Sequence, residues 1–253
     1  MASAASLPKP TADLAIAETE PRHPAFVRVS HWLVTLCFLA LLVSGLEILI
    51  SHPRFYWGEQ GTVRSPALFT LPIPASRAAV LTGYDFVLPD QNGWSRSMHF
   101  QFAWILVFAG VSYTVCGLLS GHLRARLVPS RSDLTWANLS KLLASELRLR
   151  PGGLGEGRSY NTLQRFSYLV VAFLLFPLLI WTGLAMSPAI VSVTPPLVEV
   201  FGGRQSARTI HFIVSTLLVA FVLVHVLMVW RAGFKSRTMA MVTGATEPEG
   251  DPR

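Results

Sequence analysis

Charged residues are scarce in this sequence: they make up 14% of the chain, whereas hydrophobic residues make up 51%. Because a soluble domain usually carries about 25% charged residues, this composition points to lipid rather than water as the main surroundings. Cysteine is scarcer still, and Cys37 and Cys116 both lie inside apolar stretches. A disulfide framework and a thiolate metal site are therefore not expected, and the absence of a CxxCH motif excludes covalently attached c-type haem.

Long apolar stretches are abundant, and four of them reach the length of about 20 residues that a helix needs to cross a bilayer. They cover residues 29–50, 98–119, 166–186 and 209–230. We therefore predict an all-α integral membrane protein, a four-helix bundle that occupies residues 26–238. Pro177 is expected to kink the third helix, which membrane helices tolerate when neighbours satisfy the freed carbonyl.

The net charge of +7 comes from Lys and Arg residues that lie mainly in the tails and in the loops between apolar stretches. We interpret them as topology signals, so nucleic acid is not an expected partner. Their excess in the tails and in the loop between the second and third spans predicts that these parts are cytoplasmic and that loops 51–97 and 187–208 face outward. Residues 1–25 lack the apolar core of a cleaved signal peptide. They and residues 239–253 are predicted to be disordered tails.

Two segments outside the spans have a character of their own. Residues 132–148 begin with a possible helix cap at Ser132 and place several leucines on one face, which predicts an amphipathic helix on the cytoplasmic membrane surface. The outer loop 51–97 is long and rich in proline, glycine and aromatic residues. Long ordered loops are usually functional, so this loop is expected to be a docking platform for an outer partner, or else a cap packed on the bundle.

Four of the seven histidines lie inside predicted spans: His31, His99, His211 and His225. Taken singly, each could be hydrogen-bonded to a neighbouring helix, but ionisable residues in spans are rare and usually functional. His211 and His225 lie on nearly the same face of one helix, roughly 21 Å apart along its axis. Their depths match those of His99 at the outer side and His31 at the cytoplasmic side. The sequence therefore predicts two histidine pairs, and each pair has the donor set of a six-coordinate haem.

An arginine precedes three of these histidines by three residues, namely Arg28, Arg96 and Arg208. Residues at this spacing share a helix face, and each arginine is expected to point toward the nearer membrane surface. Arginine binds carboxylates in a bidentate manner, so these side chains are candidates for contacts with haem propionates. Arginine at a span end can also simply anchor the helix by snorkelling.

These motifs resemble the di-haem cytochrome b subunits of bacterial respiratory enzymes, within the cytochrome b561-like superfamily. Comparable subunits serve formate dehydrogenase, nickel–iron hydrogenase and thiosulfate reductase, and residues 52–59 look most like the last type. The resemblance covers roughly residues 25–238, although no strong internal repeat is evident. The matching features are Arg28-x-x-His31-Trp32, Ser44-Gly45, His99, Tyr160-Asn161-x-x-Gln164, Thr182-Gly183 and the His211…His225 spacing.

The resemblance implies two haems b, one held by His31 and His225 and the other by His99 and His211. It also implies a quinone site beside the cytoplasmic haem. The residues that match it are Tyr160, Asn161 and Gln164, which could equally be a helix cap.

By the same resemblance, the chain is expected to lie among the lipids of a bacterial cytoplasmic membrane and to exchange electrons between quinone and an outer-face oxidoreductase. The expected partner is a molybdopterin enzyme that acts on a sulfur compound, and no nucleophile–base pair is evident in the chain itself. Two alternatives remain. One is a stand-alone cytochrome b that reacts with superoxide or a soluble acceptor. The other is a haem-free transporter or scaffold, although Glu47 is the only acid in the predicted spans.

Overall fold

The computed structural model describes residues 23–62, 64–73, 92–123 and 162–244. Several predictions concern residues outside these ranges. They are the amphipathic helix at 132–148, most of both tails, and Tyr160 and Asn161 of the quinone site.

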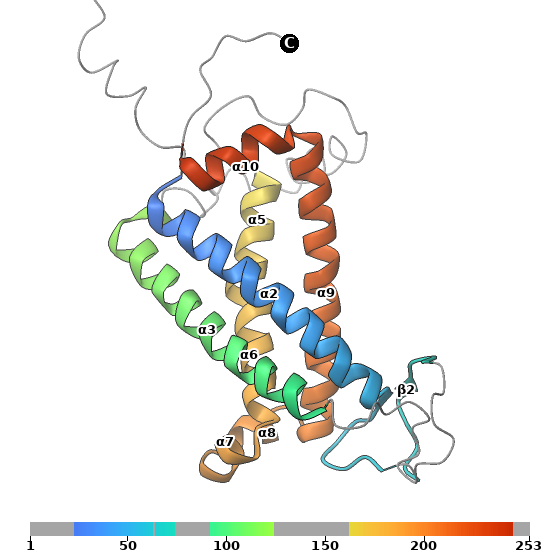
Figure 1. Cartoon of the computed structure of the whole chain (residues 1–253). Coiled ribbons are helices and arrows are strands. Elements are labelled where there is room, and N and C mark those ends of the chain that lie inside the picture. The colour runs from blue at the N-terminus through green and yellow to red at the C-terminus, as the bar shows by residue number, and fades with distance from the viewer. Residues whose placement is uncertain (1–22, 63, 74–91, 124–161, 245–253) are drawn as a thin grey trace, which may run out of the picture.

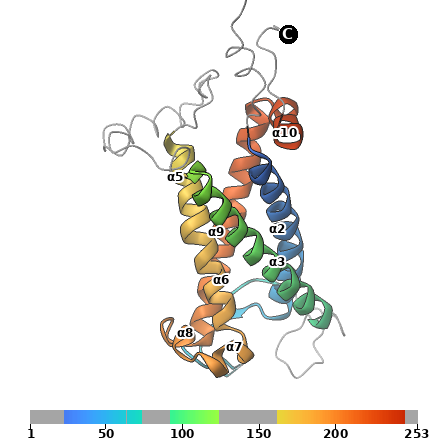
Figure 2. The ribbon, with the colours of Figure 1, turned by 90° about the vertical axis from the view of Figure 1, so that its left-hand side faces the viewer.

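The described residues form four membrane-spanning segments, which confirms the predicted all-α membrane bundle. The first two are α2 (Ala25–Ser51) and α3 (Asn92–Leu119), which pack along each other. The third consists of α5 (Thr162–Val170), η2 (Val171–Leu175) and α6 (Phe176–Ala185), and α6 packs along the fourth, α9 (Arg204–Arg231). Figures 1 and 2 show all four running between the same two ends of the molecule.

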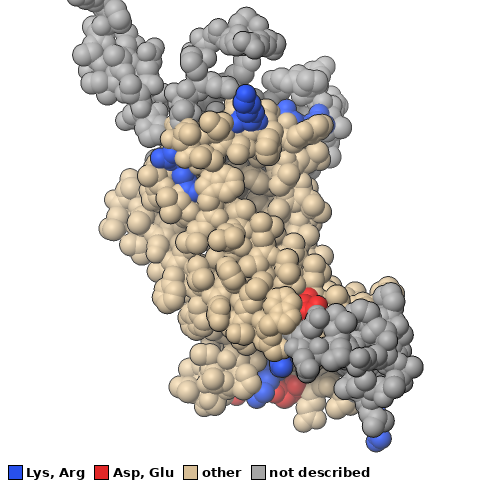
Figure 3. Space-filling model, viewed as in Figure 1, with Lys and Arg blue, Asp and Glu red and all other residues tan. Residues whose placement is uncertain are grey.

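The surface of these segments is apolar, as lipid surroundings require. Large hydrophobic side chains such as Phe108 (65% exposed) and Leu223 (67% exposed) point away from the bundle. Figure 3 shows Lys and Arg gathered at the two ends of the molecule, with a broad, almost uncharged band between them. A soluble protein rarely exposes so large an apolar surface, so the band corresponds to the membrane interior.

The third span departs from a regular α-helix at η2, a π-helix that ends just before Pro177. The N–H of Phe176 bonds to the carbonyl of Val171, five residues earlier. Proline has no N–H, so Pro177 cannot supply the usual helical hydrogen bond to the carbonyl four residues before it. The irregularity that Pro177 predicts in this span therefore coincides with a π-turn, a common form of helix distortion.

Loop 51–97 folds back on the bundle over its described part. Strands β1 (Arg54–Phe55) and β2 (Phe69–Thr70) pair antiparallel, and the short helices α7 (Pro188–Val193) and α8 (Pro196–Glu199) lie at the same end. Phe55 is buried, and its ring lies 4.5 Å from that of Phe212 in α9. The described part of the loop is therefore a cap packed on the bundle, which leaves Trp57 61% exposed.

Residues 58 and 59 accept hydrogen bonds from the backbone N–H groups in the first turn of α9. We call these contacts the loop–α9 clasp. The Gly58 carbonyl accepts hydrogen bonds from the N–H groups of Gln205 (3.0 Å) and Ser206 (3.2 Å), and the Ser206 hydroxyl accepts one from the Gly58 N–H (2.7 Å). The Glu59 carboxylate accepts the N–H of Arg204 at 2.9 Å and forms an ion pair with its side chain. The first N–H groups of a helix have no partner within it, so the clasp caps α9.

At the opposite end, α10 (Phe234–Thr243) lies across the start of α2 (Figure 1). The Arg28 guanidinium donates to the Val242 carbonyl at 2.9 Å, and the Trp32 indole donates to the Met241 carbonyl at 3.2 Å. The prediction of a disordered tail from residue 239 onward is therefore wrong as far as Thr243. The helix forms because α2 supplies donors to the carbonyls at its C-terminus, a contact that the local sequence does not reveal.

Candidate haem-binding site

The structure brings together both predicted histidine pairs. His31 of α2 and His225 of α9 have ring centroids 6.4 Å apart with an interplanar angle of 54°. His99 of α3 and His211 of α9 have centroids 6.3 Å apart at 58°. The two pairs thus share one geometry, with α9 contributing to both, and all four side chains are half-buried.

This spacing suits one metal atom between each pair of rings. A bond from a metal to an imidazole nitrogen is about 2 Å long, and each ring centre lies about 1 Å beyond its nitrogen, so two such ligands place the centroids about 6 Å apart. Within the described residues, no group of three or more His, Cys, Asp or Glu side chains could hold a metal ion. Two histidines alone leave the other coordination positions to a further ligand, such as the flat ring of haem.

The His99–His211 pair is hydrogen-bonded through Nδ1 to the neighbouring helices. The Ser44 hydroxyl of α2 lies 2.9 Å from Nδ1 of His99, and the Thr182 hydroxyl of α6 lies 2.9 Å from Nδ1 of His211. A partner at Nδ1 orients each ring and leaves Nε2 for a metal, as is usual for metal-bound histidine. Ser44 and Thr182 belong to dipeptides that carry the family resemblance, but the sequence alone gave them no role.

Two buried nitrogens in or beside the His31–His225 pair near α10 have no hydrogen-bond partner in the described part of the chain. They are Nδ1 of His31 and Nε of Arg28. Buried donors are normally satisfied, so these atoms fit a site that takes a polar or anionic group. His225 packs its ring against Phe221, with centroids 5.9 Å apart.

A family model provides the decisive comparison, because the model for prokaryotic cytochrome b561 matches residues 22–244. The chain belongs to the prokaryotic cytochrome b561 family. It is also similar to the putative protein-methionine-sulfoxide reductase subunit YedZ1 of Azospira oryzae. The two are 29% identical over 214 residues, which cover 82% of this chain and 89% of that protein. No solved structure matches.

This cytochrome b561 is accordingly a membrane protein that carries electrons by means of haem b. The haem-free transporter or scaffold is excluded by family membership. The four apolar spans fit a multi-pass protein of a bacterial inner membrane.

Two of the arginines predicted to contact haem propionates, Arg208 and Arg96, lie at the same end of this cytochrome b561 but in different surroundings. Arg208 donates to the backbone carbonyls of Arg54 and His52 and lies 4.9 Å from the Phe55 ring centroid. It therefore helps hold the cap formed by loop 51–97, a role that the sequence did not reveal. Arg96 is exposed at the start of α3. Desolvation lowers the pKa of His52, and the nearby charges of Arg208 and Arg96 lower it further.

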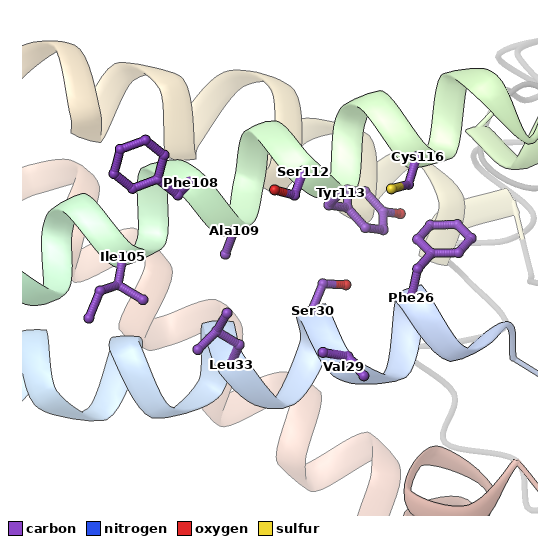
Figure 4. A pocket seen from close by; sticks show the side chains of 10 residues that line it. All are labelled: Phe26, Val29, Ser30, Leu33, Ile105, Phe108, Ala109, Ser112, Tyr113 and Cys116. Atoms are coloured by element: carbon purple, nitrogen blue, oxygen red, sulfur yellow. The ribbon is translucent and has the colours of Figure 1, made fainter.

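The predicted quinone residues are only partly covered by the structure. Gln164 lies in α5, but its side chain is outside the described part, as are Tyr160 and Asn161. A separate apolar groove of about 380 Å³ runs between α2 and α3 (Figure 4). It is lined by residues such as Phe26, Phe108 and Tyr113, and by none of the four paired histidines, so it is distinct from the candidate haem-binding site.

Proposed function

We propose that this cytochrome b561 carries electrons between a quinone near the end that bears α10 and an oxidoreductase at the opposite, outer face. His31 and His225 hold one haem b, and His99 and His211 hold the second. The observation that supports this proposal is the presence of two histidine pairs with nearly equal separations, 6.4 Å and 6.3 Å, along one helix. The end that bears α10, and with it both termini, is cytoplasmic.

Haem b bound in these sites supplies one-electron redox chemistry. The histidine rings fix each group at a set depth, and the apolar faces of the spans exclude water from it. Arg28, Arg96 and Arg208 neutralise the propionates. Tyr160, Asn161 and Gln164, the residues that match the quinone site of the resembled subunits, would bind the quinone head group.

The partner is a molybdopterin-type oxidoreductase at the outer face that reduces methionine sulfoxide in proteins. The name of the Azospira relative, a putative protein-methionine-sulfoxide reductase subunit, supports this assignment. Conversion of a sulfoxide to methionine and water consumes two electrons and two protons, so electrons flow from quinol through this chain to the partner. The sulfur-containing substrate agrees with the resemblance to the thiosulfate reductase type.

Quinol-driven haem reduction in proteoliposomes tests this electron path. We expect a menaquinol analogue to reduce both haems of the wild type. In His225→Ala, the outer haem should stay oxidised with quinol but still be reduced by dithionite. His122→Ala is the matched control, because His122 contacts the Phe26 ring at 5.5 Å and belongs to neither histidine pair. An unchanged rate of quinol reduction of the outer haem in His225→Ala contradicts the path. Rapid oxidation by a soluble acceptor without any partner favours a stand-alone enzyme.

A further inference from the structure

Two fully buried hydroxyls occupy equivalent places in the bundle. Ser44 in α2 and Thr182 in α6 both have a relative exposure of 0%. Each hydroxyl lies close to backbone carbonyls of the preceding turn of its own helix and to a histidine of the adjacent helix. The carbonyl distances are 2.8 Å to Ala40 and 3.2 Å to Leu41 from Ser44, and 2.8 Å to Leu178 and 3.0 Å to Leu179 from Thr182.

This arrangement determines which atom donates to which. A hydroxyl has one proton, and a carbonyl can only accept. A hydroxyl that donates to a carbonyl of its own helix leaves its oxygen to accept a hydrogen bond from the histidine. We assign the ring proton of His99 and of His211 to Nδ1 on this ground, because the same tautomer leaves the lone pair of Nε2 for a metal.

The glycine after each hydroxyl confirms that the two sites are equivalent. A Cβ atom placed on Gly45 would lie 3.5 Å from Cε1 and 3.9 Å from Nδ1 of His99. A Cβ atom on Gly183 would lie at the same two distances from His211. Each histidine ring is thus held by a hydroxyl and lies against the adjoining glycine of the neighbouring helix.

The pair near α10 differs, because Nδ1 of His31 is buried without a hydrogen-bond partner among the described residues. The hydroxyl contacts described above are thus a property of the outer pair.

We propose that Ser44 and Thr182 are positioning residues that hold His99 and His211 as Nδ1-protonated ligands and set the redox potential of the outer haem. This inference rests on the proposed function, which assigns the two histidines to the iron. An acceptor at Nδ1 makes an imidazole a stronger donor to the metal, and this favours ferric over ferrous iron. Loss of either hydroxyl should therefore raise the potential of the outer haem and leave that of the other haem unchanged.

Redox titration of the full-length protein in detergent, followed by visible absorption, tests the proposal. Thr182→Val keeps the shape of the side chain and removes the hydroxyl. We expect both haems to be retained and the preference of the outer haem for the ferric state to fall about tenfold, which is about 59 mV for one electron. Ser44→Ala should give a similar shift, and the double variant a larger shift than either single variant. The ferric low-spin EPR signal of the outer haem should change in the same variants.

Two controls separate the hydrogen bond from the packing. Thr182→Ser keeps the hydroxyl and should retain the wild-type potential. Thr216→Val makes the same change in α9, where the hydroxyl donates to the Phe212 carbonyl at 2.9 Å, and should shift neither haem. The proposal is overturned if Thr182→Val and Ser44→Ala shift the outer haem no more than Thr216→Val does. It is also overturned if Thr182→Ser shifts it as far as Thr182→Val.

Haem retention distinguishes failure of this inference from failure of the proposed function. If His211→Ala keeps both haems, His211 is not a ligand and the proposed site is wrong. If His211→Ala loses one haem and the hydroxyl variants keep the wild-type potentials, only the role of Ser44 and Thr182 is wrong. Ser44 lies on a different helix from Thr182. The redox titration of Ser44→Ala therefore tests the proposal independently if Thr182→Val fails to assemble.

Discussion

Gly203→Ala tests the loop–α9 clasp, because Gly203 precedes α9 and lies against the loop backbone. Its backbone has φ +125° and ψ 170°, a region that is almost confined to glycine. A Cβ atom there would lie 2.5 Å from the carbonyl carbon and oxygen of Gly58. Backbone atoms cannot rotate away as a flexible side chain can, so the loop must move and the clasp must open.

The expected cost has two parts. The backbone strain contributes about 1–3 kcal/mol, and the hydrogen bonds between Gly58 and residues 205 and 206 contribute about 1 kcal/mol each. Because there are three such hydrogen bonds, we expect the free energy of unfolding to fall by about 4–6 kcal/mol. Gly233→Ala is the matched control, because Gly233 also has a positive φ (96°) but no atom within 4 Å of the added Cβ. It should cost about 1–2 kcal/mol.

Unfolding in mixed micelles with increasing SDS, followed by circular dichroism, measures both variants under one condition. If Gly203→Ala is no more destabilising than Gly233→Ala, the close approach of Gly203 to Gly58 does not hold the loop. The stabilising role assigned to the clasp is then wrong.

The remaining predictions concern the two ends of the bundle. Glu59→Ala should lower the free energy of unfolding by about 1 kcal/mol, mainly through the lost acceptor at the start of α9, since the ion pair with Arg204 is half-exposed. Glu59→Gln keeps a hydrogen-bond acceptor, so its free energy of unfolding should fall less than that of Glu59→Ala. An equal fall in both variants contradicts the capping role of Glu59. Trp32→Phe removes the hydrogen bond to Met241, about 0.5–1.5 kcal/mol, and should speed tryptic cleavage in α10 several-fold. Trp230→Phe, at a 68% exposed position, is its control, and equal cleavage in both variants argues against the contact.

The membrane spans and the histidine pairs could be predicted because their signals are local or periodic. Composition alone identifies an apolar stretch, and the spacing of His211 and His225 fixes their relative depth on one helix. The clasp could not be predicted, because Glu59 and Arg204 meet only after the chain has crossed the membrane twice, in the second and third spans. The end of α10 could not be predicted for the same reason, since its partners Arg28 and Trp32 are more than 200 residues away in the sequence.

A weak sequence similarity between the first and third spans pointed to Ser44 and Thr182, but the spacing within the two spans differs by one residue. Arg28-Val-Ser30 and Arg165-Phe-Ser167 open the first and third spans in similar ways, and a hydroxyl–glycine–leucine motif lies near the end of each. Ser44 lies 16 residues after Arg28, whereas Thr182 lies 17 after Arg165. The π-turn of η2 accommodates one additional residue, so both hydroxyls reach a histidine of the adjacent helix.

Haem b content per chain, measured by pyridine haemochrome assay on the purified protein, tests the paired-histidine site most directly. We expect two haems in the wild type and in His122→Ala. His211→Ala should lose mainly the outer haem, and His225→Ala mainly the other, so that about one remains in each. A wild type without haem, or two haems in both His211→Ala and His225→Ala, contradicts the assignment of these histidines as iron ligands.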